Sequence, residues 1–225
     1  MRNMLKSLPL SAEFVIVVVG AFGVAILSNV LALVHLLPPT VVASTPRLLG
    51  LALHDAILVA VLGSFLYLRG WTPQRIGLTF RWSDVLWGVA LLAGVCVVYY
   101  GAWYGMSHLA PGLIHSPART SLETSALSPL SVSAVVIVNP FFEELFLTGY
   151  VIAALKDVRT ATFAINLSVA IRLLSHLSLG APGVIAIIPM GLIFGYWFAR
   201  TRRLWPVIGA HMLMNLAAFL YPMIR

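Results

Sequence analysis

Six polar side chains stand out within otherwise apolar stretches of the chain. They form three groups, namely Glu143 with Glu144, Arg172 with His176, and His211 with Asn215. Carboxylates and imidazoles are the side chains that most often act as general acids and bases, and they also bind divalent metals. Because isolated polar and charged groups are costly in apolar surroundings, we expect the three groups to converge on one polar cavity.

Two of the groups have helical spacing. Arg172 and His176 are four residues apart, and so are His211 and Asn215 in the segment GAHMLMNL. Residues four apart on a helix share a face. A helix carrying His211 can therefore present an imidazole and a carboxamide side by side.

The two glutamates lie in the stretch NPFFEELFLTGY. Adjacent residues differ by about 100° around a helix, so one carboxylate can face a cavity while the other faces a neighbouring helix. Pro140, three residues before Glu143, removes a backbone donor and predicts a bend that brings water closer to the acids.

The composition identifies the class of protein that must position these groups. Of the 225 residues, 60% are hydrophobic and 9% are charged, against about 45–50% and about 25% in soluble domains. The sequence therefore predicts an all-α polytopic membrane protein. The single cysteine, Cys96, excludes an intramolecular disulfide.

Apolar runs of roughly 17–25 residues, long enough to cross a bilayer as helices, predict a bundle of about seven spans. They cover residues 14–37, 48–68, 85–106, 132–155, 160–179, 183–199 and 204–224. We read 14–37 as a retained first helix because it is too long for a signal peptide. Residues 1–225 are expected to form one integral membrane domain.

The net charge of +7 is explained by topology. With a cytoplasmic N-terminus, ten of the 14 Lys and Arg residues fall on the inner side, and only Arg47, Arg119 and Arg225 fall on the outer side. This asymmetry follows the positive-inside rule. A nucleic-acid partner is therefore not expected. Membrane lipids are the expected partners.

Structural readings compete with these functional ones. Paired acids can hold a bundle together, and intramembrane His or Asn can simply bridge helices. For His54 and Asp55, which follow LGLAL in the second span, a helix–helix hydrogen bond is the preferred reading and Asp55 is expected to stand apart from the other acids.

From about residue 132 to 220 the chain resembles the CPBP family, the CAAX-protease and bacteriocin-processing membrane proteins also called Abi. The family motif E-E-x-x-x-R, usually followed by Gly-Tyr, corresponds to EELFLTGY. The motif F-x-x-x-H corresponds to RLLSH, and H-x-x-x-N or H-x-x-x-D to HMLMN. Residues 132–220 are thus expected to be the catalytic core.

The resemblance implies an intramembrane glutamate endopeptidase that forms no acyl-enzyme. Glu143 would act as general base on a water also held by His176, and would then protonate the leaving amine. His211 and Asn215 would donate hydrogen bonds to the oxyanion. Glu144 would orient these groups.

Two positions depart from the family motifs. Thr148 replaces the arginine of the first motif, and Arg172 replaces the phenylalanine of the second. We therefore hypothesise that Arg172 pairs with Glu144 across a helix interface and restores the missing charge. The alternative is a degenerate, non-catalytic relative that acts as a membrane-bound immunity or partner-binding module.

The depths at which the candidate residues are expected to lie in the membrane do not agree with their meeting in one site. At about 1.5 Å per residue, Glu143 lies roughly 18 Å, His176 roughly 24 Å and His211 roughly 11 Å from the inner ends of their spans. Tilt, a bend at Pro140, or a fifth helix that begins below the bilayer surface would be needed to align them.

Other functions are less favoured. H-E-x-x-H is absent and each His has its own helix, so the zinc signal is weak; no cofactor is expected, although a divalent metal is not excluded. A proton-coupled transporter would show repeated halves, and none is visible. The expected substrate is a membrane-associated protein or peptide, and the expected location is a prokaryotic inner membrane.

Overall fold

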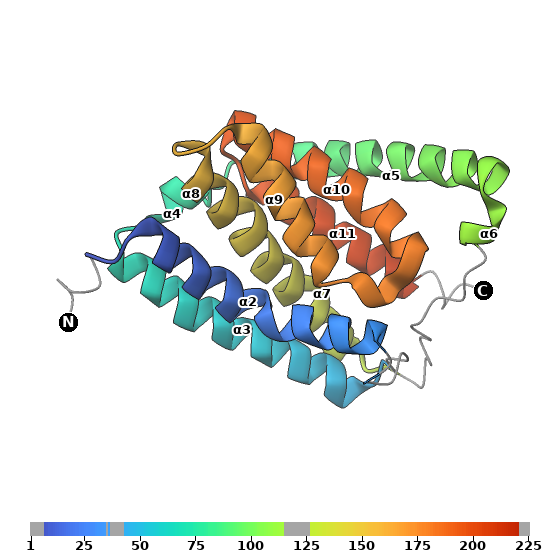
Figure 1. Cartoon of the computed structure of the whole chain (residues 1–225), viewed down its shortest axis with the longest axis horizontal. Coiled ribbons are helices and arrows are strands. Elements are labelled where there is room, and N and C mark those ends of the chain that lie inside the picture. The colour runs from blue at the N-terminus through green and yellow to red at the C-terminus, as the bar shows by residue number, and fades with distance from the viewer. Residues whose placement is uncertain (1–6, 35, 37–42, 115–126, 221–225) are drawn as a thin grey trace.

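The computed structural model describes residues 7–34, 36, 43–114 and 127–220. Every regular element among the described residues is a helix, and the helices pack into a bundle (Figure 1). The predicted all-α fold is therefore confirmed.

Among the described residues, five helical segments are long and apolar enough to cross a membrane. They are α2 (Leu10–Leu33), α3 (Thr45–Leu68), α5 (Ser83–Leu109), the continuous segment Pro129–Lys156, and α10 (Gly180–Thr201). Two shorter apolar helices, α9 (Ala161–Leu174) and α11 (Trp205–Leu220), complete the seven predicted segments. The connections contain α4 (Pro73–Ile76), α6 (Pro111–Ile114) and the 3-10 turn η2 (Leu177–Leu179).

Two predicted segments end earlier in the structure than expected, and the predicted end of a third lies outside the described residues. The first helix ends at Leu33 rather than at residue 37, and the last predicted span runs past residue 220, outside the described residues. The span expected over 160–179 is wrong at its end, because α9 stops at Leu174 and the chain turns through Ser175 and His176. Hydropathy misses this turn because Leu177 and Leu179 continue the apolar pattern. With 14 residues, α9 is about 21 Å long, less than the roughly 30 Å of a hydrocarbon core.

The segment 129–156 occupies the middle of the bundle (Figure 1). The helices α2 and α3 lie side by side at one edge, and α5 lies at the opposite edge. In the direct contacts, α3 packs on α7, α11 packs on both α5 and α7, and α9 packs on α10. The segment with the paired acids is therefore reached from several sides by other helices.

The central segment changes its helix type at the two glutamates. It consists of α7 (Pro129–Glu143), the π-helix η1 (Glu144–Val151) and α8 (Ile152–Lys156). The helix continues through Pro140, which lies within α7 and has no backbone N–H to give. Every residue of η1 is buried. Since π-helical turns are rare and frequent at functional sites, the junction is a candidate site on backbone grounds alone.

A buried carboxylate ties α2 to the centre of the bundle. Glu13 accepts hydrogen bonds from Arg69 Nε at 2.5 Å, Trp71 Nε1 at 2.8 Å and the Tyr150 hydroxyl at 3.1 Å. Glu13 is 2% exposed, so these donors offset a large desolvation cost. The N-terminal helix is thus fixed to η1 through Tyr150.

Close packing at the same region depends on one glycine. A Cβ atom on Gly149 would lie 2.8 Å from Ile76 Cγ2 and 3.0 Å from Leu204 Cδ2. A side chain there would force α4 away from η1. Gly149 therefore lets the backbone of the π-helix approach the loop before α5.

Candidate active site

Glu143, the last residue of α7, has two differently occupied carboxylate oxygens. Its Oε2 accepts a hydrogen bond from Arg172 Nη1 at 3.0 Å. Its Oε1 lies 3.7 Å from His176 Nε2 and 3.4 Å from Asn139 Nδ2. Within the described part of the chain, no cation lies as close to Oε1 as Arg172 lies to Oε2, so Oε1 is the oxygen better placed to accept a proton.

Both carboxylate oxygens of Glu144, the first residue of η1, have close partners. Its Oε1 lies 2.7 Å from His211 Nδ1 and 2.8 Å from Arg172 Nη2. Its Oε2 accepts the hydroxyl hydrogen of Thr148 at 2.6 Å. Glu144 is 0% exposed. Its carboxylate is therefore suited to holding other side chains in place.

Arg172 connects the two acids from α9. The guanidinium reaches Glu143 with Nη1 and Glu144 with Nη2, and the residue is 1% exposed. The structure thus contains the Arg172–Glu144 ion pair that the sequence predicts, together with a second pair to Glu143. A planar guanidinium suits such a two-pronged contact.

His176 lies in the turn that follows α9. Its Nδ1 is 2.9 Å from the Arg172 carbonyl oxygen, which can only accept a hydrogen bond. The hydrogen therefore sits on Nδ1, and Nε2 faces Glu143. The side chain is 31% exposed, so the edge of the site at His176 is open.

His211 and Asn215 both lie on α11, but their surroundings differ. His211 is 6% exposed and contacts Glu144, whereas Asn215 is partly buried and its side chain makes no hydrogen bond to the described residues. Five of the six candidate residues are therefore joined by direct contacts. The carboxamide of Asn215 stands one helical turn beyond them.

The depth difficulty rests on an assumption that the structure does not meet. Residue counting presumes straight, uniform, full-length α-helices. Here α9 is short and His176 follows its end, while Glu143 and Glu144 lie where an α-helix becomes a π-helix. The three motif segments meet because their helices are unequal.

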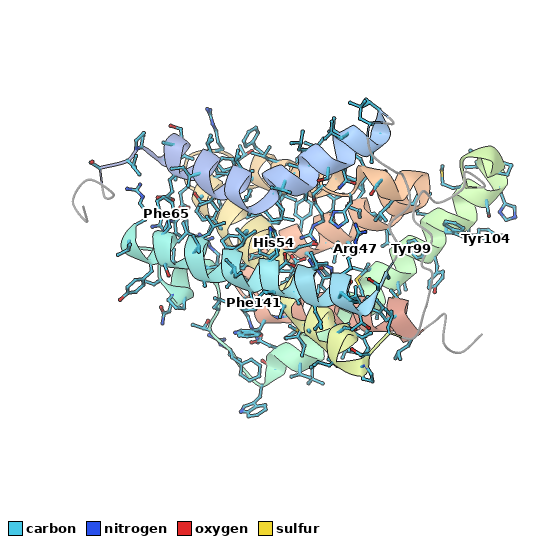
Figure 2. The ribbon with its side chains drawn as sticks, turned by 90° about the horizontal axis from the view of Figure 1, so that it is seen from below. Arg47, His54, Phe65, Tyr99, Tyr104 and Phe141 are labelled. Atoms are coloured by element: carbon cyan, nitrogen blue, oxygen red, sulfur yellow. The ribbon has the colours of Figure 1, made fainter. Side chains whose placement is uncertain are left out.

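Asn139 and Asp55 extend the cluster beyond the residues that the sequence singles out. Asn139 Nδ2 lies 3.0 Å from Asp55 Oδ2 on α3, and Asp55 Oδ1 lies 3.2 Å from His54 Nδ1. His54 lies near the middle of α3 (Figure 2). Asp55 does form the expected helix–helix hydrogen bond, but it does not stand apart, because Asn139 also contacts Glu143. The i, i+4 spacing of Asn139 and Glu143 was the available signal.

Asn29 on α2 is a second residue without a motif signal. Its Nδ2 donates to the Ser175 carbonyl oxygen at 2.8 Å, and its Oδ1 accepts from the Ser178 amide at 2.8 Å. Both bonds are to the turn that carries His176. The N-terminal helix thus braces the turn that carries this imidazole.

Three side chains of the cluster could also act as ligands of a divalent metal. Glu143, Glu144 and His211 each offer one ligand atom, and these atoms lie within 4.8 Å of one another. Arg172, however, already contacts both carboxylates. A divalent cation bound there would face this buried positive charge at close range. The donor set suits a guanidinium better than a metal ion.

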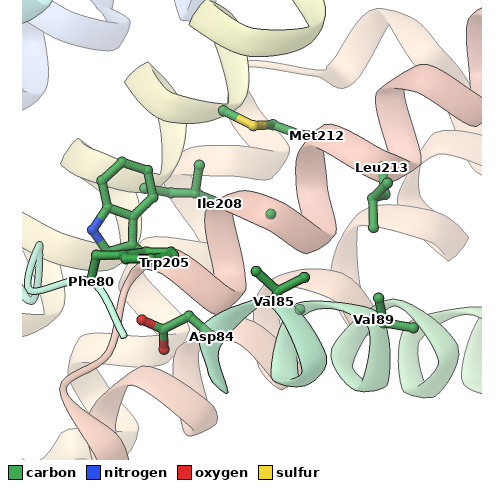
Figure 3. Close-up of a pocket in the computed structure, with 10 residues that line it drawn as sticks. Phe80, Asp84, Val85, Val89, Trp205, Ile208, Met212 and Leu213 are labelled. Atoms are coloured by element: carbon green, nitrogen blue, oxygen red, sulfur yellow. The ribbon is translucent and has the colours of Figure 1, made fainter. Parts of the chain in front are cut away.

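A separate cavity of about 320 Å³ lies between α5 and α11 (Figure 3). Phe80, Val85, Trp205 and Met212 contribute to its largely apolar lining, and Asp84 lies at its edge. None of the six candidate residues lines it. It is therefore distinct from the cluster around Glu143.

Comparison with known proteins points to membrane peptidases. Residues 125–217 match the family described as "Type II CAAX prenyl endopeptidase Rce1-like". This segment contains all six candidate residues. A curated protein of Bacillus subtilis strain 168, "Putative membrane peptidase YdiL", is 27% identical over 151 residues, which are 66% of this chain and 58% of that protein. The chain thus aligns with less than two thirds of this relative's length, and no solved structure matches the chain.

Proposed function

We propose that this chain, whose residues 125–217 match the Rce1-like family, is an intramembrane endopeptidase in which Glu143 activates water. Its substrate would be a peptide bond of a membrane-associated protein or peptide. One observation supports the mechanism above the others. Glu143 Oε1 lies 3.7 Å from His176 Nε2, too far for a direct hydrogen bond but suitable for both atoms to hold one water.

In the first step, the water held by Glu143 and His176 attacks the carbonyl carbon of the substrate. Its proton passes to Glu143 Oε1, which Arg172 does not contact. Arg172 on Oε2 keeps the carboxylate oriented. The new C–O bond leaves negative charge on the former carbonyl oxygen.

The oxyanion would be stabilised from α11. His211 contacts Glu144 through Nδ1, which leaves Nε2 as the ring nitrogen that would donate a hydrogen bond to the oxyanion. Asn215 has a carboxamide free of other hydrogen bonds within the described residues. Preorganised donors of this kind contribute most in a site that excludes water.

In the second step the C–N bond breaks and Glu143 returns the proton to the leaving amine. The carboxylate is thereby regenerated, and no covalent acyl-enzyme forms. Glu144 keeps Arg172 and His211 in position throughout. No metal takes part, in line with the charge that Arg172 brings to the site.

The surroundings of the protein follow from its helices. Five helical segments of the described chain are long and apolar enough to span a membrane, so the protein is integral to a membrane and contacts lipid. We place it in a prokaryotic inner membrane, with the N-terminus in the cytoplasm, because of the distribution of basic residues and the bacterial relative.

The experiment compares the membrane proteomes of cells that express the wild type, Glu143→Gln or Asp157→Asn. Asp157 is exposed and serves as the matched control for loss of one acid. New protein termini are mapped by mass spectrometry at equal expression. Termini present with wild type and Asp157→Asn, and absent with Glu143→Gln, are the expected result. Termini that do not depend on Glu143 would favour a non-catalytic partner-binding role.

Peptide cleavage can also be measured directly, with the purified protein in liposomes. Two fluorescence-quenched peptides are compared, one with a farnesylated CAAX terminus and its unprenylated twin. Cleavage of the first alone would identify a prenylated substrate. Cleavage of both would identify a peptidase that recognises the peptide chain without requiring the prenyl group.

A further inference from the structure

A carboxamide joins Glu143 to a third buried acid. Asn139, on α7, lies 3.0 Å from Asp55 Oδ2 and 3.4 Å from Glu143 Oε1 through the same nitrogen, Nδ2. Asp55 is 2% exposed and comes from α3. Asp55 and Glu143 are thus held on either side of one amide group.

The chemistry of these partners determines how the amide is oriented. Asp55 and Glu143 offer carboxylate oxygens, which accept hydrogen bonds when ionised. An Asn side chain has two hydrogens on Nδ2 and none on Oδ1. Only the orientation with Nδ2 between the acids gives each a donor. Asp55 therefore fixes the direction in which Asn139 presents its second hydrogen.

That second hydrogen reaches the oxygen on which the proposed chemistry depends. Arg172 holds Oε2 of Glu143, which leaves the carboxylate able to turn about the bond to its own side chain. A donor on Oε1 restricts this rotation and fixes the plane of the carboxylate. Oε1 is the atom that faces His176.

We propose that Asn139, anchored by Asp55, is a positioning residue that sets the carboxylate plane of Glu143 toward His176. This inference rests on the proposed function and deepens it. Asp55 acts through Asn139 as a hydrogen-bond acceptor and takes no proton from the substrate. The helix α3, outside the matched family segment, thereby contributes to the site.

The test measures peptide hydrolysis in liposomes for four variants of the full chain, with the two quenched peptides described above. Asn139→Leu removes the donor at similar volume and should lower kcat by about 10-fold to 100-fold, with KM within about twofold. Asp55→Leu should lower kcat by a smaller factor. Asp55→Asn retains an acceptor oxygen and should be close to wild type.

The fourth variant, Asp55→Leu with Asn139→Leu, is decisive. If Asp55 acts only through Asn139, the double variant has the kcat of Asn139→Leu alone. The proposal is overturned if Asp55→Leu costs the same factor in both backgrounds, or if Asn139→Leu keeps the wild-type kcat. Should Asn139→Leu not fold, the difference between Asp55→Leu and Asp55→Asn decides the same question.

Failure of this inference can be told from failure of the proposed function. If Glu143→Gln is inactive and Asn139→Leu fully active, only the positioning role falls. If wild type and Glu143→Gln hydrolyse the peptides equally, the proposed function falls and the positioning role with it. Thermal unfolding of the same four variants then shows whether Asn139 and Asp55 are coupled. If the stability losses of the two single leucine variants add up in the double variant, the contact between the two side chains contributes nothing to stability.

Discussion

Thr148 donates its hydroxyl hydrogen to Glu144 Oε2 over 2.6 Å, at the position where the CPBP motif carries arginine. The cation that the motif would provide comes instead from Arg172, whose Nη2 lies 2.8 Å from Glu144 Oε1. Glu144 therefore has both a neutral donor on its own helix and a charged partner on α9. The positive charge that pairs with Glu144 thus comes from a neighbouring helix instead of from the helix of Glu144 itself.

Moving that charge back should restore the site. Arg172→Phe recreates the second family motif but leaves two buried carboxylates without their cation, and should cost about 3–5 kcal/mol of unfolding free energy. Adding Thr148→Arg supplies a cation four residues after Glu144 and should recover about half of the loss or more. Thermal unfolding in detergent measures both effects.

The control for this exchange is Arg172→Phe with Thr148→Val, which has no added charge. It should be at least as unstable as Arg172→Phe, because Glu144 also loses its hydroxyl donor. Equal stability of Arg172→Phe and wild type would show that the ion pairs to both acids contribute nothing.

Replacing each glutamate by glutamine should affect stability and hydrolysis differently at the two positions. Glu144→Gln puts a neutral group against three donors and should destabilise the fold by about 1.5–3 kcal/mol or more. Glu143→Gln loses a base but keeps an oxygen for Arg172, so it should abolish hydrolysis with a smaller change in stability. Unfolding and peptide hydrolysis are measured on the same preparations. The reverse order of stabilities would contradict the assignment of Glu144 as the orienting acid.

Sequence patterns predict the helices and the motif residues of this protein, and the structure shows why other features escape them. Hydropathy finds α2 and α3 because each is a long apolar run. It does not find the end of α9, since the turn through His176 is flanked by leucines. The π-helix that begins at Glu144 has no hydropathy signal, because its residues are as apolar as those of an α-helix.

Asparagines are the main omission in the predicted site. Asn29 and Asn139 are single uncharged residues in apolar spans, where an amide most often bridges helices. Their significance comes from partners 146 residues away for Asn29 and 84 residues away for Asn139. Spacing within one helix cannot reveal such contacts.

Loss of Asn29 should misplace His176. Asn29→Leu removes both bonds to the turn at Ser175 and Ser178, so the imidazole would no longer be held opposite Glu143. We expect a fall in kcat of about tenfold, with little change in KM. Steady-state hydrolysis of the quenched peptides measures it.

The matched control for Asn29→Leu is Asn166→Leu. Asn166 lies on α9 and is exposed, without a side-chain hydrogen bond among the described residues. This control should hydrolyse peptides at the wild-type rate. An equal loss of kcat in both variants would show a general effect of added apolar bulk.

Metal chelation should leave the activity unchanged. Arg172 already provides the positive charge that faces Glu143 and Glu144, and a metal ion would have to share this space. Hydrolysis is measured after dialysis against EDTA and against 1,10-phenanthroline. Loss of activity that Zn²⁺ or Mn²⁺ restores would contradict the metal-free mechanism.

The side chains of Glu13, Asn29 and Asp55 all reach into the motif-bearing half from helices that lie before it in the chain. The part of the protein that carries the family motifs is therefore held in place by contacts with the helices that precede it. A fragment of residues 127–220 would contain every motif residue and yet lack these three supporting contacts to the proposed site. In this protein the helices before the matched family segment provide the frame of the site through these three anchoring contacts.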